Sequence, residues 1–155
     1  MLFIMEINNN KNTATFMHLS ALTQYIIPFG NFIIPILIWS AKKDKSKYLD
    51  AQGKQVINFQ LSLFMYSLIL SIIAIPIFII TVLKNVSIYE FSNHNEFPFR
   101  HFNIENINGI VIIGLLAVVI FLVLKIVEFF IIILAAVKTS NGIDYKYPLS
   151  IPFLK

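Results

Sequence analysis

Two charged residues lie deep in an otherwise uncharged apolar segment of the chain. Lys125 and Glu128 are three residues apart, so in a helix their side chains share one face. A lone charge in a bilayer costs roughly 2.5–3.5 kcal/mol on insertion scales, and a pair of opposite charges lowers that cost. The spacing fits a structural ion pair, and it equally fits an intramembrane relay or a counter-charge for a substrate.

A row of polar side chains runs into the second long apolar stretch. Four of them recur three or four residues apart, at Gln55, Asn58, Ser62 and Tyr66. Unpaired amides are costly in lipid, so this face should point towards other helices. The spacing predicts interhelical hydrogen bonds, including one from Asn58, and it also allows a polar path or a ligand site. The candidate polar residues are Gln55, Asn58, Gln60, Ser62, Tyr66, Lys125 and Glu128.

The other polar residues follow no catalytic or metal-binding pattern. The three histidines, His18, His94 and His101, are scattered, and His18 is expected to act as an interfacial anchor. The chain has no cysteine, which excludes disulfides and thiolate metal sites. We find no Ser/His/Asp arrangement and no glycine-rich phosphate loop. The sequence therefore predicts no catalytic residue, no metal, no cofactor and no enzymatic activity.

Lysines gather between the first and second apolar stretches, at Lys42, Lys43, Lys45, Lys47 and Lys54. Near an anionic surface each basic residue contributes about 1 kcal/mol. The cluster is interpreted as a topology anchor or as a site for phosphate or anionic lipid. Asp50 precedes the apolar run, where its carboxylate is expected to cap the first turn of a helix.

The composition indicates that membrane helices must position these residues. Of 155 residues, 57% are apolar and 13% are charged, and the mean hydropathy is +0.78. A small soluble domain could not bury this much apolar surface. We therefore do not expect the chain as a whole to be a soluble enzyme, a disordered segment or a nucleic-acid-binding module. The expected partners are the lipid bilayer and other membrane proteins or further copies of the chain, with no nucleic acid.

Uncharged stretches predict an all-α, polytopic helical membrane protein with a short, broken first helix pair and two long transmembrane helices. A span needs about 20 apolar residues. We expect a disordered N-terminal tail over 1–12 and a single membrane domain over 13–155. Its helical segments are 13–27, 31–41, 50–84 and 107–138, with a cytoplasmic loop 42–49, an external loop 85–106 and a C-terminal tail 139–155.

The first apolar stretch is interrupted at Pro28-Phe29-Gly30-Asn31. Its two arms would be about 22 Å and 16 Å long as helices, so neither crosses a bilayer alone. Together they form one broken span or fold back as a hairpin, and composition leaves both open. Residues 27–30 fit a type I turn, with proline second and glycine fourth.

Lysine asymmetry predicts the orientation. Basic residues are concentrated in the 42–49 loop and in the C-terminal tail, and the positive-inside rule puts both in the cytoplasm. We therefore expect a bacterial cytoplasmic membrane protein with a cytoplasmic C-terminus. The charges at Glu6 and Lys11 leave the side of the N-terminus open.

Several short motifs occur in order along residues 16–155. They are His18-Leu19-Ser20-Ala21-Leu22, residues 27–31, Leu37-Ile38-Trp39 before Lys42-Lys43-Asp44, Gly53-Lys54 with Asn58-Phe59-Gln60, and residues 145–151 with Tyr147-Pro148-Leu149. This order resembles a widespread family of small bacterial membrane proteins of unknown function. That family is grouped distantly with the twenty-kilodalton inner-envelope subunit of the chloroplast protein translocon. Gln52 stands where that family usually has histidine, and Pro152 where it has a basic residue.

The resemblance implies four helical segments with both termini in the cytoplasm, and so favours the hairpin. It supplies no biochemical function. The first hypothesis is a non-enzymatic helical scaffold for assembly or translocation of membrane proteins. The alternative is a small oligomeric transporter or ion-conducting protein that uses Lys125 and Glu128.

Overall fold

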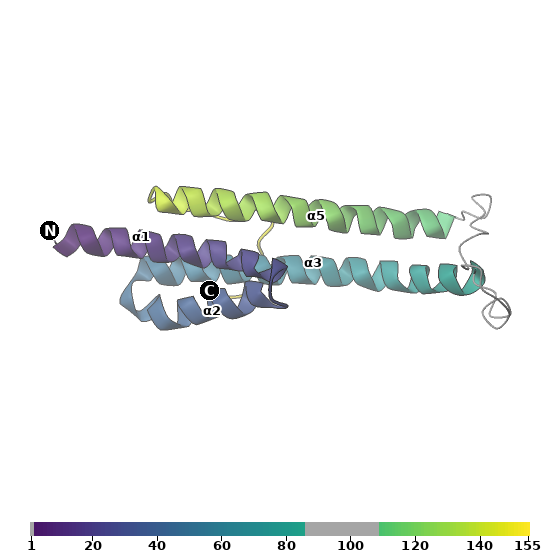
Figure 1. Cartoon of the computed structure of the whole chain (residues 1–155), viewed down its shortest axis with the longest axis horizontal. Coiled ribbons are helices and arrows are strands. Elements are labelled where there is room, and N and C mark those ends of the chain that lie inside the picture. Colours follow the sequence, from purple (N-terminus) through teal and green to yellow (C-terminus); the bar gives the residue numbers. More distant parts are fainter. Residues whose placement is uncertain (1, 86–108) are drawn as a thin grey trace. The chain divides into compact units, whose positions relative to one another are not determined.

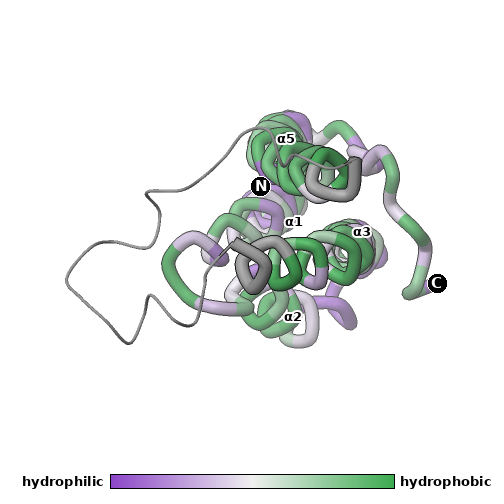
Figure 2. The backbone as a smooth tube through the Cα atoms, turned by 90° about the vertical axis from the view of Figure 1, so that its right-hand side faces the viewer, coloured by the Kyte–Doolittle hydropathy of each residue, from purple (hydrophilic) through white to green (hydrophobic). Residues whose placement is uncertain are grey.

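The computed structural model describes residues 2–85 and 109–155, and the predicted external loop falls outside this part apart from Asn85. The described residues form four α-helices and no strand: α1 (Leu2–Ser20), α2 (Gly30–Lys42), α3 (Lys47–Asn85) and α5 (Gly109–Ser140). Two 3-10 turns, η1 (Ala21–Tyr25) and η2 (Lys43–Lys45), connect them. Two candidate spans, Lys47–Ile80 and Ile112–Ser140, are long and apolar enough to cross a membrane, as predicted. Both helices are hydrophobic over most of their turns (Figure 2).

The N-terminal segment differs from the prediction. Residues 2–12 belong to α1, where a disordered tail was expected. The sequence from residue 2 to residue 20 contains no proline or glycine, so nothing interrupts the helix. Ala14 and Met17 are fully buried, and this packing holds the C-terminal half of the helix.

The first apolar stretch folds back as a hairpin rather than as one broken span. α1 and α2 pack against each other, and η1 and a tight turn lie between them (Figure 1). The Gly30 amide donates to the Ile27 carbonyl at 3.0 Å, which closes the predicted turn. Phe29 has a φ of 60°, however, so the turn has the positive third position of type II, and the type I prediction is wrong.

α3 begins three residues before its predicted start, which changes its cap. The Ser46 hydroxyl accepts from the Tyr48 amide at 3.2 Å, as a capping side chain does. Asp50 lies inside the first turns of α3, and the prediction that it caps the helix is therefore wrong. Ser46 takes this role because it is the last extended residue before α3, with a φ of −158°.

The chain divides into two compact units, each described by itself. Unit 1 contains residues 1–65 and 124–155. In it α1 lies beside α2, the first turns of α3 and the last turns of α5 (Figures 1 and 2). The buried core residues of unit 1 include Met17, Leu49, Val56, Phe59, Ile132 and Ala135.

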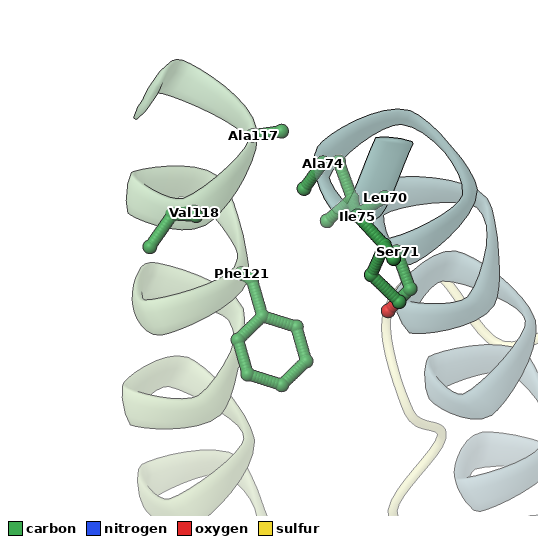
Figure 3. Close-up of a pocket in the computed structure, with 7 residues that line it drawn as sticks. All are labelled: Leu70, Ser71, Ala74, Ile75, Ala117, Val118 and Phe121. Atoms are coloured by element: carbon green, nitrogen blue, oxygen red, sulfur yellow. The ribbon is translucent and has the colours of Figure 1, made fainter. Parts of the chain in front are cut away.

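Unit 2 contains residues 66–123, from the second half of α3 and the first half of α5. Small residues bring these two helix segments close together. A Cβ added at Gly114 would lie 2.7 Å from a methyl carbon of Ile77. An apolar pocket of about 140 Å³ lies beside this contact, with Ala74 and Ala117 facing each other across it (Figure 3). Ser71 supplies the hydroxyl among its lining residues.

Candidate functional site

A buried histidine stands at the centre of a polar network in unit 1. His18 Nε2 lies 2.9 Å from the Oε1 of Gln52, and the Nε2 of Gln52 donates to Asp144 at 3.0 Å. The amide oxygen of Gln52 can only accept, so His18 carries its hydrogen on Nε2. Its Nδ1 then accepts from the hydroxyl of Tyr147, 2.7 Å away. The network therefore has one direction, from Tyr147 through His18 and Gln52 to Asp144.

His18 is fully buried, and the expectation of an interfacial anchor is wrong. Burial penalises the charged imidazolium and lowers the pKa of His18 from 6.5 to about 4, although the Gln52 hydrogen bond opposes the shift. The imidazole is neutral at pH 7, which is the form that this hydrogen-bond pattern requires. His18 therefore acts as a bridge between α1, α3 and the C-terminal segment.

Tyr147 anchors the C-terminal segment into this network. Its ring stacks on Phe59 of α3, with centroids 4.1 Å apart and planes 14° from parallel. Tyr145 meets the same ring edge-on at 5.3 Å. Burial raises the pKa of the Tyr147 hydroxyl well above its ordinary value of 10.0, so it remains a donor. Two residues of the resemblance motifs, Phe59 and Tyr147, are thus direct contact partners.

Pro148 and Leu149 of the same motif form the turn after this anchor. Both are exposed, and Leu149 has a positive φ of 58°. A proline followed by a residue of positive φ is the pattern of a type II turn, as at Pro28 and Phe29. The turn leads the chain from Tyr147 towards the contacts of residues 151–154 with α3.

The predicted charged pair is present in α5. Lys125 Nζ and Glu128 Oε2 are 2.8 Å apart, and the Glu128 side chain is 1% exposed against 33% for Lys125. The sequence did not indicate the third member, Gln24 of η1. Its Nε2 donates to Glu128 Oε1 at 2.8 Å, and its Oε1 accepts from Lys125 at 3.3 Å. The three side chains form a closed ring that joins η1 to α5.

The polar face of α3 has a different partner from the one predicted. Asn58 Nδ2 donates to the carbonyl of Leu154 at 3.0 Å, and Asn58 Oδ1 accepts from the Leu154 amide at 2.8 Å. Ser62 Oγ accepts from the amide of Ile151 at 2.8 Å and donates to the Asn58 carbonyl. Asn58 therefore binds the non-helical C-terminal segment and not another helix, so that prediction is wrong. The segment is available because its backbone is not paired within a helix.

The remaining candidate residues do not join one site. Gln60 does connect two helices, because its Oε1 accepts from Asn31 of α2 at 2.7 Å. Its buried Nε2 has no hydrogen-bond partner among the described residues. Gln55 is half-buried at the start of the face. Tyr66 falls in unit 2, whereas the other polar residues of this face lie in unit 1. The predicted row is thus divided among several contacts.

The Gly53-Lys54 motif builds a corner between α2 and α3. A Cβ at position 53 would collide with the indole of Trp39, so glycine allows the ring to lie against α3. Trp39 Nε1 donates to Asp50 at 2.9 Å, and Lys54 pairs with the other oxygen of the same carboxylate at 2.6 Å. The side chain of Lys54 is therefore positioned one helical turn from Asp50, with both side chains about one third exposed.

The sequence did not indicate the place of His18, Gln24, Gln52 and Asp144 in the polar networks, because each lies on a different segment. Their common signal was weak: all four are polar side chains next to apolar runs or motif residues. Residues 18 and 147 are 129 positions apart, and only folding brings them together. Among the described residues, no group of three or more histidine, aspartate or glutamate side chains could hold a metal ion.

Comparison with known proteins identifies a family. Residues 9–154 match the model of the magnetosome magnetite crystal formation protein family. No curated protein and no solved structure matches. The expected grouping with the chloroplast translocon subunit is not shown by these comparisons. The match covers the helices, the polar networks and the C-terminal segment.

Proposed function

Because this chain belongs to the magnetosome magnetite crystal formation protein family, we propose that it is a membrane scaffold that assembles other membrane proteins. The family is named for the formation of magnetite crystals in magnetosomes. The organising role at a membrane is our own proposal and is not part of that name. The scaffold would be non-enzymatic and would act through its folded surface.

One observation carries this proposal. The buried polar side chains of unit 1 bond mainly to other parts of the chain. His18, Asn58 and Glu128 each connect two or more segments that are far apart in the sequence. Buried polar groups paired in this way fix one arrangement of segments. Polar groups that are bonded within the chain suit a rigid scaffold. A reaction site instead needs polar groups that can contact a substrate.

The test is purification of the full-length, tagged chain from its native membranes after mild cross-linking. We expect a small, reproducible set of membrane proteins in near-constant ratio to the chain. The matched variant is Asn58→Leu, which removes the bonds to the C-terminal segment, and we expect it to lose partners while still inserting in the membrane. If the wild-type chain brings down no membrane protein above background, the scaffold proposal fails.

A second candidate function, transport of a proton or a small cation by an oligomer, is favoured by the ring of Gln24, Lys125 and Glu128. A carboxylate that is 1% exposed inside a candidate span is the kind of group found on proton and ion pathways. Proteoliposomes that contain the wild-type chain would then support a flux of protons or cations. Glu128→Gln, which keeps the side-chain size and the acceptor oxygen, should abolish that flux. A flux that is equal to that of empty liposomes would remove this candidate.

A further inference from the structure

The corner between α2 and α3 carries a tryptophan held in one orientation. The indole of Trp39 lies against Gly53, where no side chain other than hydrogen would fit. Its Nε1–H donates to Asp50 Oδ1 at 2.9 Å. The packing of Cδ1 and Cγ against Gly53 and the hydrogen bond of the adjacent Nε1 hold this edge of the ring against α3. A tryptophan whose ring packs on an apolar surface while its N–H meets a polar group is typical of membrane interfaces.

The charges at this corner are mostly positive. Asp50 pairs with Lys54, with Oδ2 and Nζ 2.6 Å apart, so together they contribute no net charge. Residues 42–47 contain four lysines against one aspartate, which leaves three positive charges in excess. Lys43, Lys45 and Lys47 are exposed. The ammonium of Lys43 lies 5.2 Å from the centre of the Trp39 ring, within range of a cation–π contact.

The corner also lies at the start of the uncharged stretch of α3, where the hydrocarbon core of a bilayer would begin. The stretch from residue 55 to residue 83 has no charged side chain, and it starts directly after Lys54. The candidate span in α3 therefore begins at the corner itself. Lysines at the start of a span lie at the depth of lipid headgroups, and α2 returns to the same level at Trp39 and Lys42.

We propose that this basic corner, formed by Trp39, Lys43, Lys45 and Lys47, is a binding surface for the headgroup of an anionic phospholipid. The lysines neutralise the phosphate, and the fixed indole contacts the apolar part of the lipid below it. A free phosphate would gain only the charge contacts, whereas a lipid also gains the contact with Trp39. For this reason the surface is assigned to a lipid and not to a soluble anion.

The experiment uses the full-length protein in neutral detergent and measures retention of phosphatidylglycerol and phosphatidylcholine by native mass spectrometry. We expect phosphatidylglycerol to bind more tightly, with an affinity that falls as salt is added. The triple variant Lys43→Gln, Lys45→Gln, Lys47→Gln should weaken its binding on the order of 100-fold, at about 5-fold per lysine. Phosphatidylcholine binding should not change.

A matched triple variant separates this surface from the overall charge. Lys138→Gln, Lys146→Gln and Lys155→Gln remove the same number of charges from the end of α5 and the C-terminal segment. Phosphatidylglycerol binding should stay within about 3-fold of the wild type, which is less than one lysine contributes. The double variant Lys45→Gln, Lys47→Gln avoids the Trp39 contact, and it keeps the test valid if the first triple variant does not fold.

Three outcomes would overturn the proposal. Equal losses in both triple variants would mean that lipid retention follows net charge alone. Displacement of the lipid by millimolar inorganic phosphate would show a simple phosphate site. Tighter binding of a DNA oligonucleotide than of phosphatidylglycerol would assign the surface to a soluble polyanion.

Discussion

At the scale of single residues, His18 shows how burial selects one chemical form. The imidazole accepts from Tyr147 on one nitrogen and donates to Gln52 on the other, a pattern that only the neutral ring can satisfy. An imidazolium would present a second donor, in place of the acceptor, to the buried Tyr147 hydroxyl. Burial lowers the pKa of His18 and so keeps the imidazole in the neutral form that accepts from Tyr147.

The first prediction is acid destabilisation through His18. In the unfolded chain this histidine takes up a proton below pH 6.5, but in the folded chain it does so only near pH 4. Between these values the unfolded state binds more protons, so the free energy of unfolding falls as the pH is lowered. The loss reaches up to roughly 3 kcal/mol, at about 1.36 kcal/mol per unit of pKa difference. Thermal unfolding in detergent from pH 7 to pH 4 measures it.

The control for this prediction is His18→Gln, which cannot titrate. Its unfolding temperature should be lower than that of the wild type at pH 7 and should vary much less between pH 6.5 and pH 4. An equal pH dependence in both proteins would assign the acid sensitivity to other groups.

The second prediction concerns the glycine of the Gly53-Lys54 motif. Gly53→Ala should lower the free energy of unfolding by about 1–3 kcal/mol, the usual range for overpacking, because the new methyl group would meet the indole of Trp39. The sign is diagnostic, since alanine is otherwise the better helix former by about 1 kcal/mol. Thermal unfolding of Gly53→Ala in the Trp39→Leu background should show a much smaller loss. A full loss there would mean that Trp39 is not the obstacle.

At the scale of elements, α3 serves as a receptor for the C-terminal segment. Its side chains make hydrogen bonds to backbone groups of residues 151 and 154, in the way that a neighbouring strand would. The amide of Asn58 satisfies both polar groups of one peptide residue. Residues 151–154 can therefore remain non-helical with part of their backbone paired to α3.

The third prediction is that Asn58 controls the mobility of this segment. Asn58→Leu should leave the Leu154 amide and carbonyl without protein partners, so hydrogen–deuterium exchange in residues 151–155 should become faster. Exchange in the buried turns of α1 and α5 should change little. Asn58→Asp is the matched comparison, because it keeps the acceptor oxygen and loses only the donor. Unchanged exchange at the C-terminus in Asn58→Leu would contradict this role.

The fourth prediction concerns the ring that joins η1 to α5. Lys125→Leu leaves the buried carboxylate of Glu128 with the Gln24 amide, whereas Glu128→Leu leaves an ammonium that is one third exposed. Lys125→Leu should therefore lower the folded yield more than Glu128→Leu. Breaking a buried pair costs about 3–5 kcal/mol in soluble proteins. The measurement is the monodisperse fraction in size-exclusion chromatography.

The double variant tests whether the two charges act as a pair. Lys125→Leu with Glu128→Leu should recover much of the lost yield, because apolar replacement of a whole pair is often neutral. Losses that add in the double variant would mean that each charge has its own role, which would favour the transport function.

At the scale of the whole molecule, the hairpin determines the topology. α1 runs up to η1 and α2 runs back, so the N-terminus and the α2–α3 connection lie at the same end of unit 1 (Figure 1). The end of α5 is there too, because a Cβ at Gly142 would meet the side chain of Lys11. This arrangement predicts that the N-terminus lies on the same side of a membrane as the α2–α3 connection.

The fifth prediction is that reporters fused at the N-terminus, after Lys45 and after Lys155 all read the same side of the membrane. The lysine asymmetry makes this side the cytoplasm, and a reporter inserted near Asn95 should read the opposite side. Alkaline phosphatase fusions report the external side of the membrane, and fluorescent protein fusions report the cytoplasmic side. An N-terminal reporter on the opposite side from Lys45 would contradict the hairpin in the membrane.

The sequence alone determined the class of the protein and its long helices. Uncharged runs longer than a bilayer requires are visible without any structure, because the cost of a charge in lipid leaves few alternatives. The pairing of Lys125 with Glu128 was also predictable, since residues three apart on a helix must be neighbours. Both the long helices and this ion pair can be predicted from residues that are close together in the sequence.

Only the tertiary structure decided the partners of the polar groups. Asn58 on α3 could have faced any helix, and it binds a segment 96 positions away that has no periodic pattern of its own. His18, Gln52 and Asp144 meet only after the hairpin has folded and the C-terminal segment has returned to α3. Hydrogen bonds between distant segments depend on which backbone groups are left unpaired by the helices, and that is known only once the chain is folded.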